Sequence, residues 1–196
     1  MSSLPRSNGF TLEEYFALER VSERRFEYRG GEIVCMSGGT LEHATIARNV
    51  ISRLFSNLPK GCQVYSSDLA VFVPDGRPYR YPDISVVCGE RRIRSVDGRD
   101  CLENPVLLIE VLSATSADFD RGTKFEEYKS IPEFAEYLLI SQERPHITRR
   151  RKQEDGSWVE TVFTSLAAAI RLDSISTDLD VYQAYEGIAF DSSAIL

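Results

Sequence analysis

Two carboxylic acids stand inside apolar, strand-like runs of this sequence. Asp83 lies in the run 81–87 and Glu110 lies in the run 107–113. A charged side chain is rarely buried without a partner, so each acid needs a reason for its position. Either acid alone fits an ordinary carboxylate at the edge of a strand. Together, at the ends of neighbouring strands, the two could share a divalent cation.

The chemistry of such a pair is that of a metal site. Hard cations such as Mg²⁺ or Mn²⁺ take oxygen ligands and keep several waters, so one or two carboxylates suffice. We expect Asp83, Glu110 and the backbone carbonyl of Val111 to be the ligands. The ion would polarise a phosphate and lower the pKa of a bound water. Lys124, on the helix-like segment that follows, would orient that water or offset charge on the phosphate. The set predicts metal-assisted phosphodiester cleavage.

Three other side chains are candidates for supporting roles. His43 opens a long helical segment and could contact phosphate or transfer a proton, although a lone histidine more often has a structural or solvent-facing role. Glu27 could be an additional acid near the metal, and its alternating strand fits a surface position equally well. Tyr128, one turn after Lys124, fits core packing better than catalysis.

Length and composition indicate one ordinary globular domain. The chain has 196 residues and no Pro-, Gly- or Ser-rich linker, so we expect a single domain over residues 1–196. No apolar run approaches the ~20 residues of a membrane span, and the polar opening lacks the apolar stretch of a signal peptide. We therefore expect a cytoplasmic protein without membrane contact. The cysteines form no CxxC pair and are expected to be reduced thiols: Cys35, Cys62, Cys88 and Cys101.

The charge balance limits how the chain could meet nucleic acid. A formal net charge of −7 argues against nonspecific coating of nucleic acid, because Lys and Arg neutralise phosphates. An enzyme that meets DNA or RNA over a small local surface stays compatible with it. Two basic clusters stand out, residues 91–94 with Arg99 and residues 149–152. For each, a solvated face is favoured over a phosphate contact.

The hydrophobic pattern predicts a mixed α/β (α+β) fold. Helices are expected over 11–20, 41–58 and 120–130, with a final helical turn at 179–185, and the spacing over 41–58 is the clearest. Residues 89–104 are predicted to be a polar loop, and 154–156 a hairpin turn. The expected strands are 25–29, 32–36, 62–66, 69–73, 83–88, 105–112, 136–140, 158–163 and a short one near 170.

The order of these elements resembles the restriction-endonuclease-like core of the PD-(D/E)XK superfamily. More narrowly, segments 27–34, 81–84, 109–113 and 124–128 resemble a large bacterial family of restriction-endonuclease homologues of unknown substrate. The resemblance covers roughly residues 10 to 185. It implies a central mixed sheet flanked by helices, with additional β-hairpins at both ends. It also implies a Mg²⁺-dependent DNA endonuclease, with the N-terminal end of helix 41–58 beside the site.

One departure from the superfamily pattern keeps two functions open. The pattern has a lysine two residues after the glutamate, and that position here is Leu112. The resemblance implies that the lysine has moved to the following helix as Lys124. The chain is then either a metal-dependent nuclease or a catalytically silent nuclease-fold protein that binds nucleic acid or a protein partner. A thiol hydrolase is a distant third, and a homodimer stays open.

Overall fold

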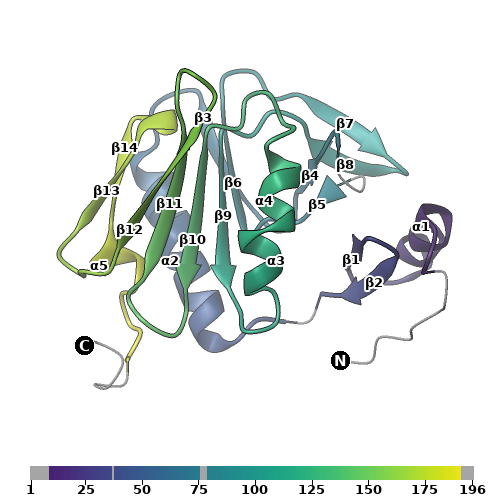
Figure 1. The fold of residues 1–196 in the computed structure, drawn as a ribbon, viewed down its shortest axis with the longest axis horizontal. Coiled ribbons are helices and arrows are strands. Elements are labelled where there is room, and N and C mark those ends of the chain that lie inside the picture. The colour runs from purple at the N-terminus through teal and green to yellow at the C-terminus, as the bar shows by residue number, and fades with distance from the viewer. Residues whose placement is uncertain (1–8, 37, 76–78, 191–196) are drawn as a thin grey trace.

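A six-stranded mixed sheet forms the centre of the computed structural model, which describes residues 9–36, 38–75 and 79–190 (Figure 1). The strand order is β12-β11-β10-β9-β6-β3. β9 and β10 run parallel, and the other neighbouring pairs are antiparallel. The strands are β3 (Cys62–Ser66), β6 (Ile84–Cys88), β9 (Leu107–Leu112), β10 (Glu136–Ser141), β11 (Ile147–Lys152) and β12 (Trp158–Phe163).

Helices cover both faces of this sheet. α2 (Leu41–Asn57) lies behind it in the view of Figure 1, and α3 (Ala117–Arg121) and α4 (Thr123–Tyr128) lie in front. Because side chains alternate along a strand, Ile109 packs with the residues of α2, whereas Leu108 packs with those of α4. Glu110 has the parity of Leu108 and therefore faces α4, the helix that carries Lys124.

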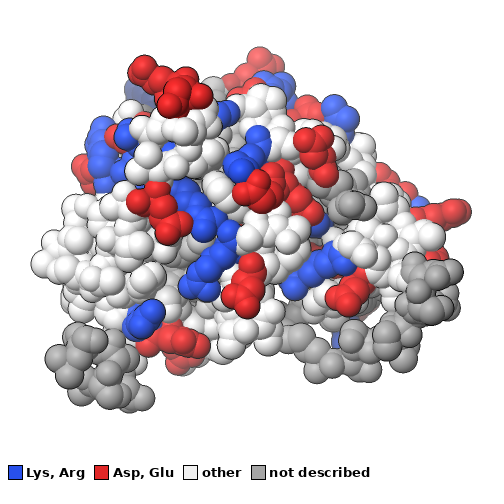
Figure 2. All heavy atoms as spheres, viewed as in Figure 1, with Lys and Arg blue, Asp and Glu red and all other residues white. Residues whose placement is uncertain are grey.

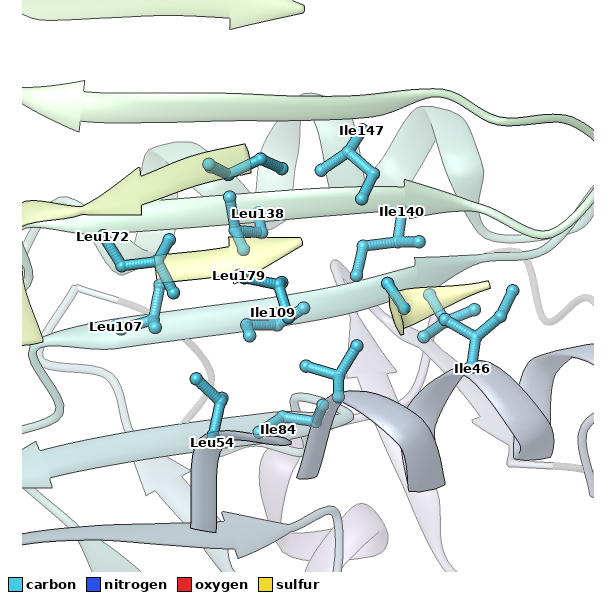
Figure 3. Close-up of a cluster of buried hydrophobic side chains, with 14 of the residues drawn as sticks. Ile46, Leu54, Ile84, Leu107, Ile109, Leu138, Ile140, Ile147, Leu172 and Leu179 are labelled. Atoms are coloured by element: carbon cyan, nitrogen blue, oxygen red, sulfur yellow. The ribbon is translucent and has the colours of Figure 1, made fainter. Parts of the chain in front are cut away.

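The larger core lies between the sheet and α2 (Figure 3). Ile46 and Leu54 of α2 pack against Ile109 and Leu138 of the central strands, and all four are at most 1% exposed. A C-terminal hairpin closes this core with β13 (Ala169–Leu172), η1 (Asp173–Ile175), β14 (Thr177–Asp180) and α5 (Val181–Ala184). Burial of this apolar surface fixes the position of α2 along the sheet, so the start of the helix lies near the end of β9.

The N-terminal elements and a second, four-stranded sheet complete the fold. Tyr15, Tyr28 and Tyr79 join them in a separate buried cluster. Within the described residues, no helix has the length and apolar character needed to cross a membrane. These elements are α1 (Leu12–Val21), β1 (Phe26–Arg29), β2 (Glu32–Cys35), β4 (Ala70–Phe72), β5 (Tyr79–Arg80), β7 (Ile93–Val96) and β8 (Arg99–Leu102), and the second sheet has the order β5-β4-β8-β7.

Two predicted elements differ from the structure. Residues 89–104, expected as a loop, contain the hairpin β7–β8. Its turn is Asp97-Gly98, both with positive φ (51° and 78°), which is a typical two-residue hairpin turn and was the missed sequence signal. The predicted helix 120–130 is instead two short helices, because the backbone at Gly122 leaves the helical region.

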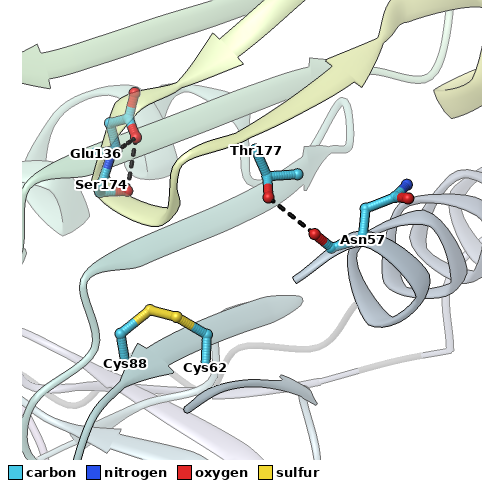
Figure 4. The surroundings of a disulfide bond; sticks show 6 residues. All are labelled: Asn57, Cys62, Cys88, Glu136, Ser174 and Thr177. Atoms are coloured by element: carbon cyan, nitrogen blue, oxygen red, sulfur yellow. Dashed lines mark hydrogen bonds between the residues drawn. A yellow bond between two sulfur atoms is a disulfide. The ribbon is translucent and has the colours of Figure 1, made fainter. Parts of the chain in front are cut away.

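The prediction of four reduced thiols is wrong for two of them. Cys62 and Cys88 lie opposite each other in the antiparallel β3–β6 pair and form a disulfide (Figure 4). Cys35 and Cys101 are free. The bonded cysteines are separated by 26 positions, so no local motif indicated the bond and only the pairing of the two strands brings them together.

The disulfide should stabilise the fold mainly by restricting the unfolded chain. Cys62→Ala/Cys88→Ala is expected to lower the free energy of unfolding by about 3 kcal/mol, since a loop of this length is closed by the bond. Urea unfolding with and without dithiothreitol measures this difference in the free energy of unfolding. Reductant should destabilise the wild type and the Cys35→Ala control, and leave the double variant unchanged. A wild type insensitive to reductant would contradict the bond.

Candidate active site

A cavity of about 890 Å³ lies where β1, the start of α2, the end of β9 and α3–α4 meet. The five side chains that the sequence indicated all line it: Glu27, His43, Asp83, Glu110 and Lys124. Val111, whose carbonyl was the third predicted ligand, lines it too. Residues far apart in the sequence are thus brought to one place by the sheet order.

Glu110 is held by contacts to one of its two carboxylate oxygens. Its Oε1 accepts a hydrogen bond from the Tyr128 hydroxyl (3.1 Å) and lies 2.9 Å from Nζ of Lys124. The side chain is only 4% exposed. Burial raises the pKa of Glu110 well above its usual range against the opposing charge of Lys124. Its other oxygen, Oε2, carries only a long hydrogen bond of 3.4 Å from the Asp83 N–H.

Asp83 stands just before β6 and is locked to β9. The antiparallel register pairs Ile84 with Ile109, which sets Asp83 beside Glu110. Its Oδ2 accepts a hydrogen bond from the Val111 N–H at 2.7 Å. Across the described residues, Oδ1 of Asp83 has no hydrogen-bond partner. One oxygen of Asp83 and one of Glu110 are therefore left to bind a cation.

His43 contacts Asp83 from the first turn of α2. Thr40 caps this helix and accepts a hydrogen bond from the His43 N–H. The ring atom Nε2 lies 3.2 Å from Oδ2 of Asp83. The hydrogen bond to Asp83 raises the pKa of His43, whereas burial lowers it. A hydrogen bond with the Val111 backbone also raises this pKa. His43 thus lies beside a candidate metal ligand, a position that fits a structural role as well as a supporting catalytic one.

Lys124 is surrounded by carboxylates. Its Nζ lies 2.9 Å from Glu110, 3.4 Å from Glu27 and 3.4 Å from Asp120, and the side chain is 4% exposed. Burial alone would lower the pKa of Lys124, but the three acids raise it well above its usual value. Arg29 also pairs with Glu27 at 2.7 Å, so two cations face these three acids and the nearby Asp83. The cavity floor thus keeps an excess of acid groups, which suits a further cation.

Two residues of this cluster gained roles that the sequence did not assign. Asp120, which is absent from the predicted site, lines the cavity and contacts Lys124 four positions later. That spacing was the available signal. Tyr128 packs in the core, as predicted, and also orients Glu110 through its hydroxyl. Glu27, for which a place near the metal and a surface position were equally open, is 3% exposed and faces Lys124.

The donor set fits a hard cation with few protein ligands. In the part of the chain that the structure describes, no group of three or more His, Cys, Asp or Glu side chains could hold a metal. Two carboxylates, one carbonyl and water are what Mg²⁺ commonly takes. The unpartnered Oδ1 of Asp83 and the excess of acid groups therefore favour a site completed by water.

Glu27 makes the stability of this region depend on pH. Burial would raise its pKa, but the charges of Lys124, Arg29 and Arg80 lower it from 4.5 to about 2. Because the folded pKa is depressed, the carboxylate stabilises the fold above about pH 4.5, and this contribution is lost as pH falls toward 2. Glu27→Gln should reduce the free energy of unfolding by on the order of 3 kcal/mol at pH 7 and by much less near pH 2.

Urea unfolding across this pH range tests the expectation. Glu32→Gln is the matched control, because Glu32 is an exposed acid on the same hairpin. It should follow the wild-type curve. If Glu27→Gln follows it as well, the ion pairs of Glu27 contribute nothing measurable.

Comparisons with known proteins agree with this fold. The profile of the Uma2 family, described as "Putative restriction endonuclease", matches residues 12–182. The Synechocystis protein slr1290 is 33% identical over 180 residues, which cover 91% of this chain and 92% of the relative. A second Synechocystis protein, sll1609, is 31% identical over 156 residues, which cover 77% of this chain and 85% of the relative.

A solved structure extends the agreement to three dimensions. It is a "putative nuclease belonging to DUF820" from Anabaena variabilis, and the match has a TM-score of 0.72 at 21% identity. The match covers 92% of this chain and 99% of that one. The predicted restriction-endonuclease-like fold is confirmed. On the extent of the profile match and of the two Synechocystis relatives, this chain belongs to the Uma2 family of restriction-endonuclease-like proteins.

Proposed function

We propose that this protein hydrolyses phosphodiester bonds in nucleic acid with a divalent ion held by Asp83 and Glu110. DNA is the favoured substrate over RNA. One observation carries the proposal: in one cavity, Asp83 keeps an oxygen that has no hydrogen-bond partner among the described residues, and Glu110 keeps one that accepts only a long hydrogen bond of 3.4 Å. The family description and the name of the Anabaena neighbour support the same class of reaction.

Each residue of the cavity would have a role that follows from its position. Asp83 Oδ1, Glu110 Oε2 and the Val111 carbonyl would hold the ion, and a bound Mg²⁺ or Mn²⁺ supplies Lewis acidity and an activated water. Lys124 neutralises part of the acid cluster and keeps Glu110 in one orientation. His43, beside Asp83 at the cavity wall, could hold a proton at Nε2 and deliver it to the leaving oxygen. Glu27 and Asp120 keep Lys124 in place.

Cleavage should depend on both acids and on the metal. Asp83→Asn and Glu110→Gln preserve shape but weaken an ion's ligand set, so each should slow cleavage by about 100-fold or more. Plasmid and RNA cleavage with Mg²⁺ or Mn²⁺, with and without chelator, measures this. Glu13→Gln, an exposed acid on α1, is the control and should cleave normally. Unchanged cleavage by Asp83→Asn would place the activity elsewhere.

Tyr128 should set metal affinity through its hydrogen bond to Glu110. Tyr128→Phe removes only the hydroxyl, and loss of such a supporting contact weakens metal binding by about 10- to 100-fold. Tyr137→Phe is the matched control, because its buried hydroxyl donates to the backbone carbonyl of Asp120 instead. Calorimetric titration with Mn²⁺ compares the two. Equal losses in both variants would indicate general packing and contradict an orienting role for Tyr128.

The alternative, binding without cleavage, rests on Lys124. Its ammonium contacts three carboxylates and is almost fully buried, so it is not free to reach a phosphate. A wild type that binds both Mn²⁺ and nucleic acid but cleaves neither DNA nor RNA would favour this alternative.

A further inference from the structure

β11 divides the basic run 149–152 between the two faces of the sheet. Arg149 lies 2.7 Å from Glu136 and 2.6 Å from Asp173, and Arg151 lies 2.8 Å from Asp173. These two arginines are therefore neutralised on one face. Arg150 and Lys152 have the opposite parity and point to the face that α4 partly covers. The run thus presents two of its cations on the α4 side.

The other basic cluster offers little free charge. Arg92 pairs with Glu133, Arg94 with Glu103, and Arg99 with Glu19. Each of these pairs has no net charge, so it attracts a phosphate less than an unpaired arginine does. The arginines of 91–94 and Arg99 are thus mostly committed to carboxylates, and a nucleic acid would find more free charge on the α4 side of β11.

Two further arginines extend the α4-side cations toward the cavity. Arg121 ends α3 and Arg144 lies in the β10–β11 turn, and both are exposed. Throughout the described residues, neither arginine forms an ion pair, and Lys152 forms none either. We call Arg121, Arg144, Arg150 and Lys152 the β11 stripe. Figure 2 shows a band of blue atoms over the region of β10 and β11, with red atoms beside it.

Local contacts tie the β11 stripe together. Arg150 donates a hydrogen bond from Nη1 to the Arg121 carbonyl at 2.6 Å, and its guanidinium lies over the Phe125 ring at 4.5 Å. Burial and the charges of Arg144 and Arg121 lower the pKa of His146, as a positive local potential would. Arg150 also pairs with Glu160, and in the described part of the chain this is the one ion pair that a member of the β11 stripe forms.

We propose that the β11 stripe binds the phosphodiester backbone of the substrate strand outside the cavity. The proposal rests on the proposed nuclease function and names the path of its substrate. Asp120 and Gln142 line the cavity, and Arg121 and Arg144 follow them by one and two positions, so the β11 stripe begins at the cavity rim. A local row of cations lets a chain of net charge −7 hold a polyanion.

The test measures nucleic-acid binding without cleavage. Arg121→Gln/Arg144→Gln removes two unpaired charges, and Lys60→Gln/Arg91→Gln removes two exposed charges near β3, at the opposite edge of the sheet. Fluorescence anisotropy with a labelled single strand and the matching duplex, in chelator and over a salt series, gives affinities. The β11 stripe variant should bind about tenfold or more weakly, with a salt slope smaller by about two.

The affinities for single strand and duplex, together with a cleavage assay, distinguish the possible results. Whichever form, strand or duplex, loses affinity in the stripe variant is the form that the β11 stripe binds. With metal, the stripe variant should show a raised KM and an unchanged kcat. Equal affinities for stripe variant and control would overturn the inference while leaving a cleaving wild type as a nuclease. A wild type that neither binds nor cleaves nucleic acid would overturn the proposed function and the β11 stripe with it.

Discussion

The buried ammonium of Lys124 is the charge on which the site depends. Removing a cation from water costs several kcal/mol, and only nearby carboxylates offset that cost. Glu110, Glu27 and Asp120 provide them from β9, β1 and α3. Lys124 therefore ties the N-terminal hairpin and the broken helix to the centre of the sheet. Deleting any one acid would unbalance a buried cluster, so the arrangement of these elements and the shape of the cavity are coupled.

The same contacts decide which atoms are free. Lys124 and Tyr128 both occupy Oε1 of Glu110, and the Val111 N–H and His43 both occupy Oδ2 of Asp83. The remaining oxygens face the acid-rich floor of the cavity, where a divalent ion would offset the repulsion between these acids and a phosphate. The acidity of the site and the β11 stripe outside it are then complementary. The acidic site favours a divalent ion, and the β11 stripe would attract the nucleic-acid strand.

Sequence reasoning succeeded where a signal is local. The helical spacing over 41–58 and the apolar run of β9 predicted their elements closely, and the two acids inside apolar runs, Asp83 and Glu110, line one cavity. It failed where long-range pairing decides. The Cys62–Cys88 bond depends on the β3–β6 register. Alternation in β1 cannot say which face is buried, so the position of Glu27 stayed ambiguous. The i, i+4 spacing could pair Asp120 with Lys124, but only the fold brings that pair to Glu110.

The central claim is that Asp83 and Glu110 hold one divalent ion. Crystals soaked in Mn²⁺ and measured for anomalous scattering test it most directly. We expect a single strong peak within about 2.0–2.4 Å of oxygens from both carboxylates, and the peak should be absent from Asp83→Asn crystals and lost on treatment with chelator. A cavity without a peak at saturating Mn²⁺, or a peak bound only by other residues, would contradict it.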